Sequence, residues 1–320
     1  MPCERGGSAI PSRDAHGEFL TGEAMRWCAR YGIALILPDG PGRMLTVLQS
    51  ALETDAYTLN RIPDIDPAVI RAQCAADAIG IAREIVRAKI GAGLRLIIAD
   101  NTVRREATEQ WETKLRAART VGEIMIVEAK AAAAYWRTFK DMGLREQKGG
   151  NLPRSWLRFA NRNKGAQFLG PKHAAHPINA MLNYAYVVEA GRLAKALAAR
   201  GLALPIGFLH SDRKGRNSLV WDAIEPLRPA IDARVFAYVG KREFARSDFP
   251  QTGRSTFRLS REIIQSMLDR VSQSPDDISV AADFMLQAIE RHSGSEYRLF
   301  KADLRKRQRA GVVAAVELLS

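Results

Sequence analysis

The sequence predicts an α+β fold, in which a small N-terminal β/α module (residues 1–64) precedes a larger, mainly α-helical domain (residues 65–320). Three observations lead to this prediction. Two short β-type apolar runs stand close together near the N-terminus, a segment with two prolines (RIPDIDP, residues 61–67) follows them, and helical periodicity dominates the rest. With 320 residues, of which 47% are hydrophobic and 26% charged, the chain has room for two domains and a substantial core.

The N-terminal module is predicted to contain one helix followed by a pair of strands. The run TGEAMRWCARYG (residues 21–32) begins with a threonine suited to capping and ends at a glycine, which indicates a helix. IALILPDG (33–40) is typical of a short strand ending in a turn, and RMLTVLQ (43–49) is predicted to pair with it. Because these elements are too few to bury a core, we expect the module to dock elsewhere or to lack part of a larger sheet.

Helical patterns follow one another from residue 67 onward. The first run, residues 67–90, places apolar side chains on one stripe and is predicted as a single helix. A later helix is predicted to start at His176 and Pro177, because proline suits the first turn, and to stop at Gly201. Further helices are predicted over residues 105–119, 120–143, 218–229, 261–273 and 278–293.

The charge balance favours a polyanionic partner. The chain has 48 Lys and Arg against 35 Asp and Glu, a net charge of +13. This excess favours nucleic acid over a membrane, although a merely solvated basic surface is the alternative. The three cysteines are scattered without a CxxC pair, which indicates neither a zinc site nor a disulfide framework. With no signal-peptide pattern and no membrane-length apolar run, we expect a soluble, cytoplasmic protein.

One stretch, IGFLHSDRKGRNSLVWDAIEPLRP (residues 206–229), concentrates residues that can carry chemistry. His210 ends an apolar run, and a predicted helix that stops at prolines then carries Asp222 and Glu225 three residues apart on one face. Two carboxylates at that spacing repel by roughly 4 kcal/mol at an effective dielectric near 20. A shared proton, a divalent cation such as Mn²⁺ or Mg²⁺, or a neighbouring cation could offset the repulsion. The neighbouring cations are Arg213, Lys214 and Arg216.

Six segments stand in an order that matches a known family. They are LTGEAMRWCARYGIALILPDG, RAQCAADAIGIAREIVRAKI, VEAKAAAAYW, HPINAMLNYAYVVEAG, the stretch 206–229 and FRLSREIIQSML. In this order they resemble the CRISPR-associated endonuclease/integrase family of the adaptation (spacer acquisition) step, which inserts captured DNA into the CRISPR array. Agreement among several independent segments is more specific than any single motif.

The resemblance implies a catalytic metal centre in the helical domain. Residue by residue, it implies Glu128, His210 and Glu225 as ligands of Mn²⁺ or Mg²⁺, with Asp222 beside them as a further catalytic residue. The histidine favours Mn²⁺ relative to a site built only from oxygen ligands. The resemblance also implies a homodimer, a small ferredoxin-like adaptation nuclease as partner, and double-stranded DNA (CRISPR repeat and spacer precursors) as substrate. The family's first β-strands, expected before residue 18, are missing or replaced by MPCERGGSAIPSRDAH, so we expect a truncated or divergent N-terminus.

Each of these residues also has an ordinary structural explanation. Glu128 could be a surface glutamate paired with a lysine, and His210 a satisfied loop or core residue. Asp222 has three possible roles: a metal ligand, a group that orients His210, or a salt-bridge partner of Arg228. We interpret His176 as part of the start of its helix rather than as a ligand.

The expected reaction is metal-assisted phosphodiester cleavage or strand transfer, with the basic side chains binding phosphate. Two alternatives stay open: a catalytically impaired DNA-binding relic, and a stand-alone transposon-type integrase of the same superfamily. The candidate phosphate-binding residues are Arg213, Lys214, Arg216, Lys241 and Arg242.

Overall fold

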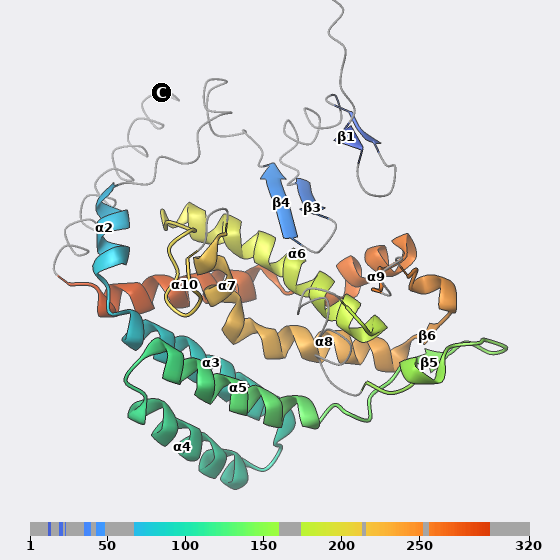
Figure 1. Cartoon of the computed structure of the whole chain (residues 1–320), viewed down its shortest axis with the longest axis horizontal. Helices are drawn as coiled ribbons and strands as arrows, with labels where there is room; N and C mark the ends of the chain where they lie inside the picture. The colour runs from blue at the N-terminus through green and yellow to red at the C-terminus, as the bar shows by residue number, and fades with distance from the viewer. Residues whose placement is uncertain are drawn as a thin grey trace, which may run out of the picture. The chain divides into compact units, whose positions relative to one another are not determined.

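A computed structural model describes most of the helical part of the chain and a few N-terminal strands. The described residues are 12–13, 19–21, 23, 35–39, 43–48, 67–159, 174–212, 216–251 and 256–294. The chain divides into two compact units, residues 1–62 and 63–320. The described part of the second unit is mainly helical, as predicted (Figure 1).

Four strands are described in the first unit, in two antiparallel pairs. Strand β1 (Ser12–Arg13) pairs with β2 (Phe19–Leu20), and β3 (Leu35–Asp39) pairs with β4 (Arg43–Leu48). The second pair confirms the predicted pairing of these two runs. Its register shifts between Leu37 and Pro38, where a proline, which has no N–H to donate, is tolerated at an irregularity of the ladder. Most of the predicted helix over residues 21–32 lies outside the described residues.

The second unit contains most of the described helices. The longer ones are α2 (Pro67–Ala75), α3 (Ala78–Ile97), α4 (Asn101–Ala117), α5 (Val121–Arg137), α6 (Pro177–Ala199), α7 (Ser218–Ile224), α8 (Arg228–Lys241), α9 (Arg261–Val271) and α10 (Pro275–His292). The short elements are the 3₁₀ turns η1 (Arg154–Trp156), η2 (Glu225–Leu227) and η3 (Arg246–Asp248), and the parallel strands β5 (Arg145–Glu146) and β6 (Glu243–Phe244). None of the described helices combines the length and the apolar character that crossing a bilayer requires.

The prediction of a single helix over residues 67–90 is wrong. The chain breaks after Ala75, and α3 starts anew with Asp77 as its N-cap, whose carboxylate accepts the backbone N–H of Ile79 at 3.0 Å. An aspartate side chain readily accepts backbone N–H groups at a helix N-terminus, which favours a new helix start over a continued helix. The continuous apolar stripe therefore did not ensure a continuous helix. Residues on the α2 side of the break, Ile70 and Cys74, are exposed, whereas Ile81 and Ile85 on α3 are fully buried.

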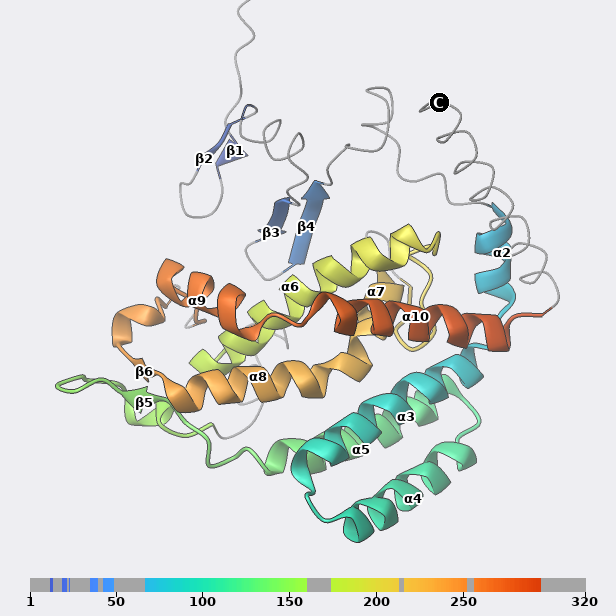
Figure 2. The same ribbon diagram turned by 180° about the vertical axis from the view of Figure 1, so that it is seen from behind.

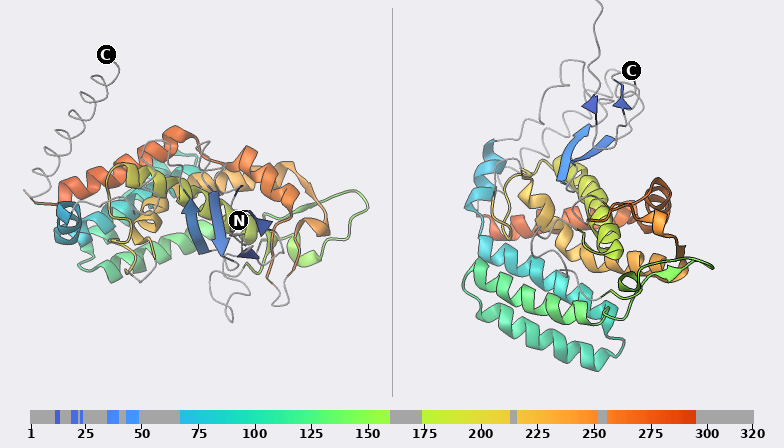
Figure 3. Two further views of the ribbon diagram at one scale, coloured as in Figure 1. Left: turned by 90° about the horizontal axis from the view of Figure 1, so that it is seen from above. Right: turned by 45° about the vertical axis from the view of Figure 1, so that its right-hand side comes forward.

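Two layers of helices position the site. Helix α3 packs against both α4 and α5, and the three lie side by side (Figures 2 and 3). Helix α6 lies among α7, α8 and α10 and buries small and apolar residues on most of its circumference, which explains the weak amphipathicity of its sequence. The turn η2 and helix α8 pack against α3 and thereby join the two layers.

The start of α6 confirms the interpretation of His176 as a helix-start residue. His176 is the N-cap, its Nδ1 accepts the backbone N–H of Ile178 at 3.1 Å, and Pro177 occupies the first turn. At the other end, Gly201 adopts a φ of 75°, which glycine tolerates best. Burial lowers the pKa of His176 from 6.5 to about 4.

We expect this cap to make the protein less stable in mild acid. The unfolded chain takes up a proton on His176 below pH 6.5, whereas the folded chain does so only near pH 4. The free energy of unfolding must therefore decrease as the pH falls from about 6.5 toward about 4, by about 2 kcal/mol between pH 7.5 and pH 5. Urea unfolding at the two pH values measures the effect, and His176→Asn, which keeps a capping side chain, should show a correspondingly smaller fall. Equal falls in the two proteins would contradict this assignment.

Candidate active site

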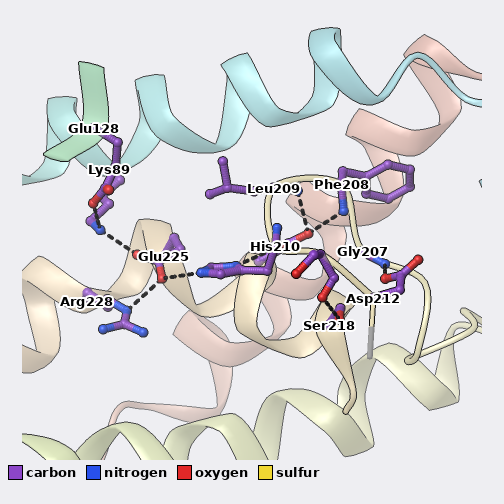
Figure 4. A network of polar contacts seen from close by, with 12 residues as sticks. Lys89, Glu128, Gly207, Phe208, Leu209, His210, Asp212, Ser218, Glu225 and Arg228 are labelled. Atoms are coloured by element: carbon purple, nitrogen blue, oxygen red, sulfur yellow. Dashed lines mark hydrogen bonds and ion pairs between the residues drawn. The ribbon is translucent and has the colours of Figure 1, made fainter. Parts of the chain in front are cut away.

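The predicted site residues come together from separate segments of the second unit (Figure 4). Glu128 lies on α5, His210 ends the loop segment 206–210, Asp222 is on α7, and Glu225 opens the turn η2. The helix predicted over residues 218–229 is shorter in the structure: α7 ends at Ile224, the 3₁₀ turn η2 follows from Glu225, and α8 begins at Arg228. The turn η2 packs against α3, so Glu225 faces α3.

Asp222 holds the loop that carries His210. Its side chain is fully buried, and its two oxygens accept the backbone N–H groups of Phe208 at 2.6 Å, Leu209 at 3.0 Å and His210 at 3.1 Å. Each hydrogen bond to a charged acceptor contributes about 1.5–3 kcal/mol. The carboxylate therefore organises this loop from within the core.

The same carboxylate orients the imidazole of His210. Its Oδ1 lies 2.6 Å from Nδ1 of His210. A carboxylate accepts hydrogen bonds, so Nδ1 carries the proton and Nε2 points the opposite way, where it lies 3.9 Å from Oε1 of Glu225. Of the three roles predicted for Asp222, this geometry favours that of a group that orients His210. Arg228, the alternative partner, pairs instead with Glu225.

Glu225 is a buried carboxylate between cations. It is 4% exposed; Nε of Arg228 lies 3.0 Å from its Oε1, and Nζ of Lys89 lies 2.6 Å from its Oε2. Burial alone would raise the pKa of Glu225, but the charges of Arg228 and Lys89 outweigh it and lower the pKa to about 2. The side chain is therefore ionised throughout the physiological pH range.

Glu128 forms an ion pair with Lys89, the same lysine that contacts Glu225. The expectation of a surface glutamate paired with a lysine is thus met in part, but this lysine bridges two carboxylates from distant segments. Sequence reasoning overlooked Lys89. The available signal was its position on α3, one helical turn after Ile85 and one before Gly93, both of which are buried.

The side chains of this site have the chemistry of divalent-cation ligands. Among the described residues, no three His, Cys, Asp or Glu side chains are arranged to hold a metal ion as they stand. The donor set nevertheless fits Mn²⁺ or Mg²⁺: two carboxylates already share one cationic group, and Nε2 of His210 faces one of them. Oε2 of Glu225 is buried and lies 2.6 Å from Nζ of Lys89, so an anionic oxygen inside the protein already has a cation beside it.

A groove of about 1040 Å³ adjoins Glu128 and Lys89 between α3, α4, α5 and the start of α8. Its lining combines cationic and aromatic side chains, an arrangement suited to phosphates and bases. These side chains are Lys89, Lys114, Lys130, Arg137, Lys140 and Arg228, with Trp111, Tyr135, Trp136 and Tyr186.

The predicted phosphate-binding residues differ in their surroundings. Arg213 and Lys214 lie outside the described residues, Arg216 is half-buried just before α7, and Lys241 is exposed in the last turn of α8. The guanidinium carbon of Arg242 lies 5.6 Å from the ring centroid of Phe244 and 5.9 Å from that of Tyr238, and the guanidinium also pairs with Asp248. Arg242 therefore already has partners within the fold.

Comparison with known sequences agrees with the segments noted above. The profile of the family described as "CRISPR associated protein Cas1" matches residues 17–273. A CRISPR-associated endonuclease Cas1 from Pyrobaculum aerophilum is 32% identical over 151 residues, which cover 47% of this chain and 43% of that protein. A CRISPR-associated protein Cas1 from Methanobrevibacter ruminantium is 30% identical over 150 residues, covering 47% and 39%. The matched region thus spans less than half of the length of these two relatives.

Comparison with solved structures shows a shared fold. A Cas1 protein from Thermotoga maritima superposes with a TM-score of 0.62 at 15% identity, over 90% of this chain and 92% of that one. A casposase bound to its integration product gives a TM-score of 0.57 at 22% identity, over 85% and 80%. A chain of a Cas6-RT-Cas1–Cas2 complex gives 0.58 at 18% identity, over 86% and 30%.

Proposed function

The chain belongs to the Cas1 family of CRISPR-associated proteins, and on this premise we propose that it is a divalent-metal-dependent DNA endonuclease and integrase of CRISPR adaptation. The family match covers most of the chain and agrees with the resemblance identified from its segments. The activity, substrates and partners that follow are our proposals.

One observation carries the proposed activity: Glu128 and Glu225, from helices far apart in the sequence, converge on one point beside the free nitrogen of His210 (Figure 4). Keeping two carboxylates this close costs several kcal/mol unless a cation is shared between them. A structural core seldom needs such an arrangement, whereas phosphodiester chemistry depends on it. We therefore assign Glu128, Glu225 and His210 as the metal-binding set.

The residues divide the work of catalysis as follows. When bound, Mn²⁺ or Mg²⁺ stabilises the charge that develops on the phosphate and lowers the pKa of the attacking hydroxyl. Glu128 and Glu225 supply the anionic oxygens, and Asp222 keeps His210 in the tautomer whose Nε2 can bind the cation. Attack by water would cleave a strand, and attack by a DNA 3′-hydroxyl would join two strands.

Double-stranded DNA is the proposed substrate, in the form of CRISPR repeat and spacer precursors. The net charge of +13 supports this, with Lys241 and Arg216 as the described candidates for phosphate contacts. We also propose a homodimer and a small ferredoxin-like adaptation nuclease as partner. The similar fold found in a Cas6-RT-Cas1–Cas2 complex is consistent with assembly of this kind.

The direct test uses supercoiled plasmid and the full chain with Mn²⁺, with Mg²⁺ and with EDTA. We expect nicked or joined products with either metal and intact plasmid with EDTA, because the carboxylates need the cation to act on phosphate. Gel-shift measurements on the same DNA monitor binding. Binding without reaction in every metal would establish the DNA-binding relic instead. A transposon-type integrase would join transposon ends in preference to spacer-length DNA with a CRISPR repeat.

A further inference from the structure

Lys89 occupies the centre of the proposed metal site. Its ammonium forms ion pairs with Oε1 of Glu128 and, at 2.6 Å, with Oε2 of Glu225 (Figure 4). Among the described residues, no other lysine or arginine forms an ion pair with Glu128, and the second cation at Glu225, Arg228, lies at the opposite oxygen. The lysine thus lies where the two proposed ligands converge.

The charges around Lys89 determine whether its ammonium and a divalent cation can occupy the site together. The ammonium of Lys89 lies in direct contact with two carboxylates from separate segments, so it is the positive charge that now stands between them. Glu128, Glu225 and Asp222 bring three negative charges when ionised, and Lys89 with Arg228 brings two positive ones. An added divalent cation would meet a strong repulsion at this range if the ammonium stayed in place.

The surrounding space allows the ammonium to leave. Lys89 lines the groove of about 1040 Å³, and its side chain is 20% exposed. A lysine stem has four rotatable carbons, so the head group can turn toward the groove without movement of α3.

We propose that Lys89 is the resident counter-cation of this site: it holds Glu128 and Glu225 together in the metal-free protein and is displaced into the groove when a divalent cation binds. This inference rests on the proposed function. Lys89 is in this view a positioning residue, which maintains the ligand arrangement and competes with the metal for it.

The test is calorimetric titration of Mn²⁺ into the full chain. Because Lys89→Met removes the competing charge but retains the apolar stem, we expect its Kd for Mn²⁺ to be at least about tenfold lower than that of the wild type. Lys89→Arg keeps the charge and should bind no more tightly than the wild type. Lys130→Met, which removes an exposed lysine lining the same groove, is the matched control and should stay within about twofold.

Two further measurements cover the case in which Lys89→Met folds poorly. In thermal unfolding, Mn²⁺ should raise the Tm of Lys89→Met by more than that of the wild type, since the variant lacks its internal cation. In the wild type, acylation of lysines followed by mass spectrometry should show that Mn²⁺ increases the labelling of Lys89 and leaves Lys130 unchanged.

The outcomes separate this inference from the proposed function. If the wild type binds Mn²⁺ and nicks DNA but Lys89→Met binds no more tightly, or if Mn²⁺ leaves the labelling of Lys89 unchanged, the displacement is overturned and the function stands. If neither the wild type nor Lys89→Met binds Mn²⁺, both the displacement and the proposed metal-dependent function are overturned. Binding by Lys89→Met alone would show that Lys89 competes with the metal for this site, but it would overturn the displacement, because the lysine would then exclude the cation from the wild type.

Discussion

Replacing Glu128 with glutamine is expected to reduce Mn²⁺-dependent DNA cleavage by about 1000-fold or more, a loss of about 4 kcal/mol of transition-state stabilisation. The glutamine side chain retains the size of glutamate but removes the anionic oxygen that now pairs with Lys89 and that we assign to the metal. Because glutamine has nearly the same shape and its amide oxygen can still accept a hydrogen bond from Lys89, the substitution should leave the fold intact. Plasmid nicking measures the activity, and a gel shift should show DNA affinity within about threefold of the wild type.

A control for this substitution lies on the same helix. Glu123 is in the first turn of α5, where its Oε2 accepts the backbone N–H of Arg119 at 2.5 Å. Glu123→Gln can keep that hydrogen bond and should leave nicking unchanged. If Glu128→Gln retained more than about a tenth of the activity, Glu128 would not be a metal ligand and the site would have to be sought elsewhere.

The largest expected effect on stability is that of Asp222→Asn, which should lower the free energy of unfolding by about 3–4 kcal/mol. Both oxygens of Asp222 accept hydrogen bonds: one from the backbone of Phe208 and Leu209, the other from the backbone and ring of His210. The asparagine NH₂ group must replace one oxygen whichever way it is turned, so two donors lose their acceptor inside the core. Denaturant unfolding measures the loss.

Asp222→Asn should also impair activity, because the imidazole of His210 loses the partner that fixes its tautomer. Asp212→Asn is the matched control. Asp212 is exposed and accepts the backbone N–H of Gly207 at 2.9 Å, a hydrogen bond that the asparagine oxygen can keep. A change of less than about 1 kcal/mol in Asp222→Asn would mean that this carboxylate does not organise the loop.

The local elements were largely predictable from local chemistry. The pairing of the two runs that form β3 and β4 is confirmed, as is the start of α6 at His176 and Pro177. Capping side chains, prolines and glycines act within a few residues of their own positions, so the sequence alone indicates where such elements begin and end. The same local rule explains the error at Asp77, where a capping aspartate interrupted an otherwise continuous apolar stripe.

The candidate site was predictable only in part. The order of its segments indicated the family, and with it Glu128, His210 and Glu225 as residues to examine. The roles of Asp222 and Lys89 depend on which groups face them from other elements, and no spacing in the chain records that. Packing of α5 and η2 on α3 brings two distant carboxylates to one lysine. The sequence by itself determined the family and the ends of most helices, whereas only the tertiary structure decided which charges meet, because electrostatic interactions depend on distances in space rather than along the chain.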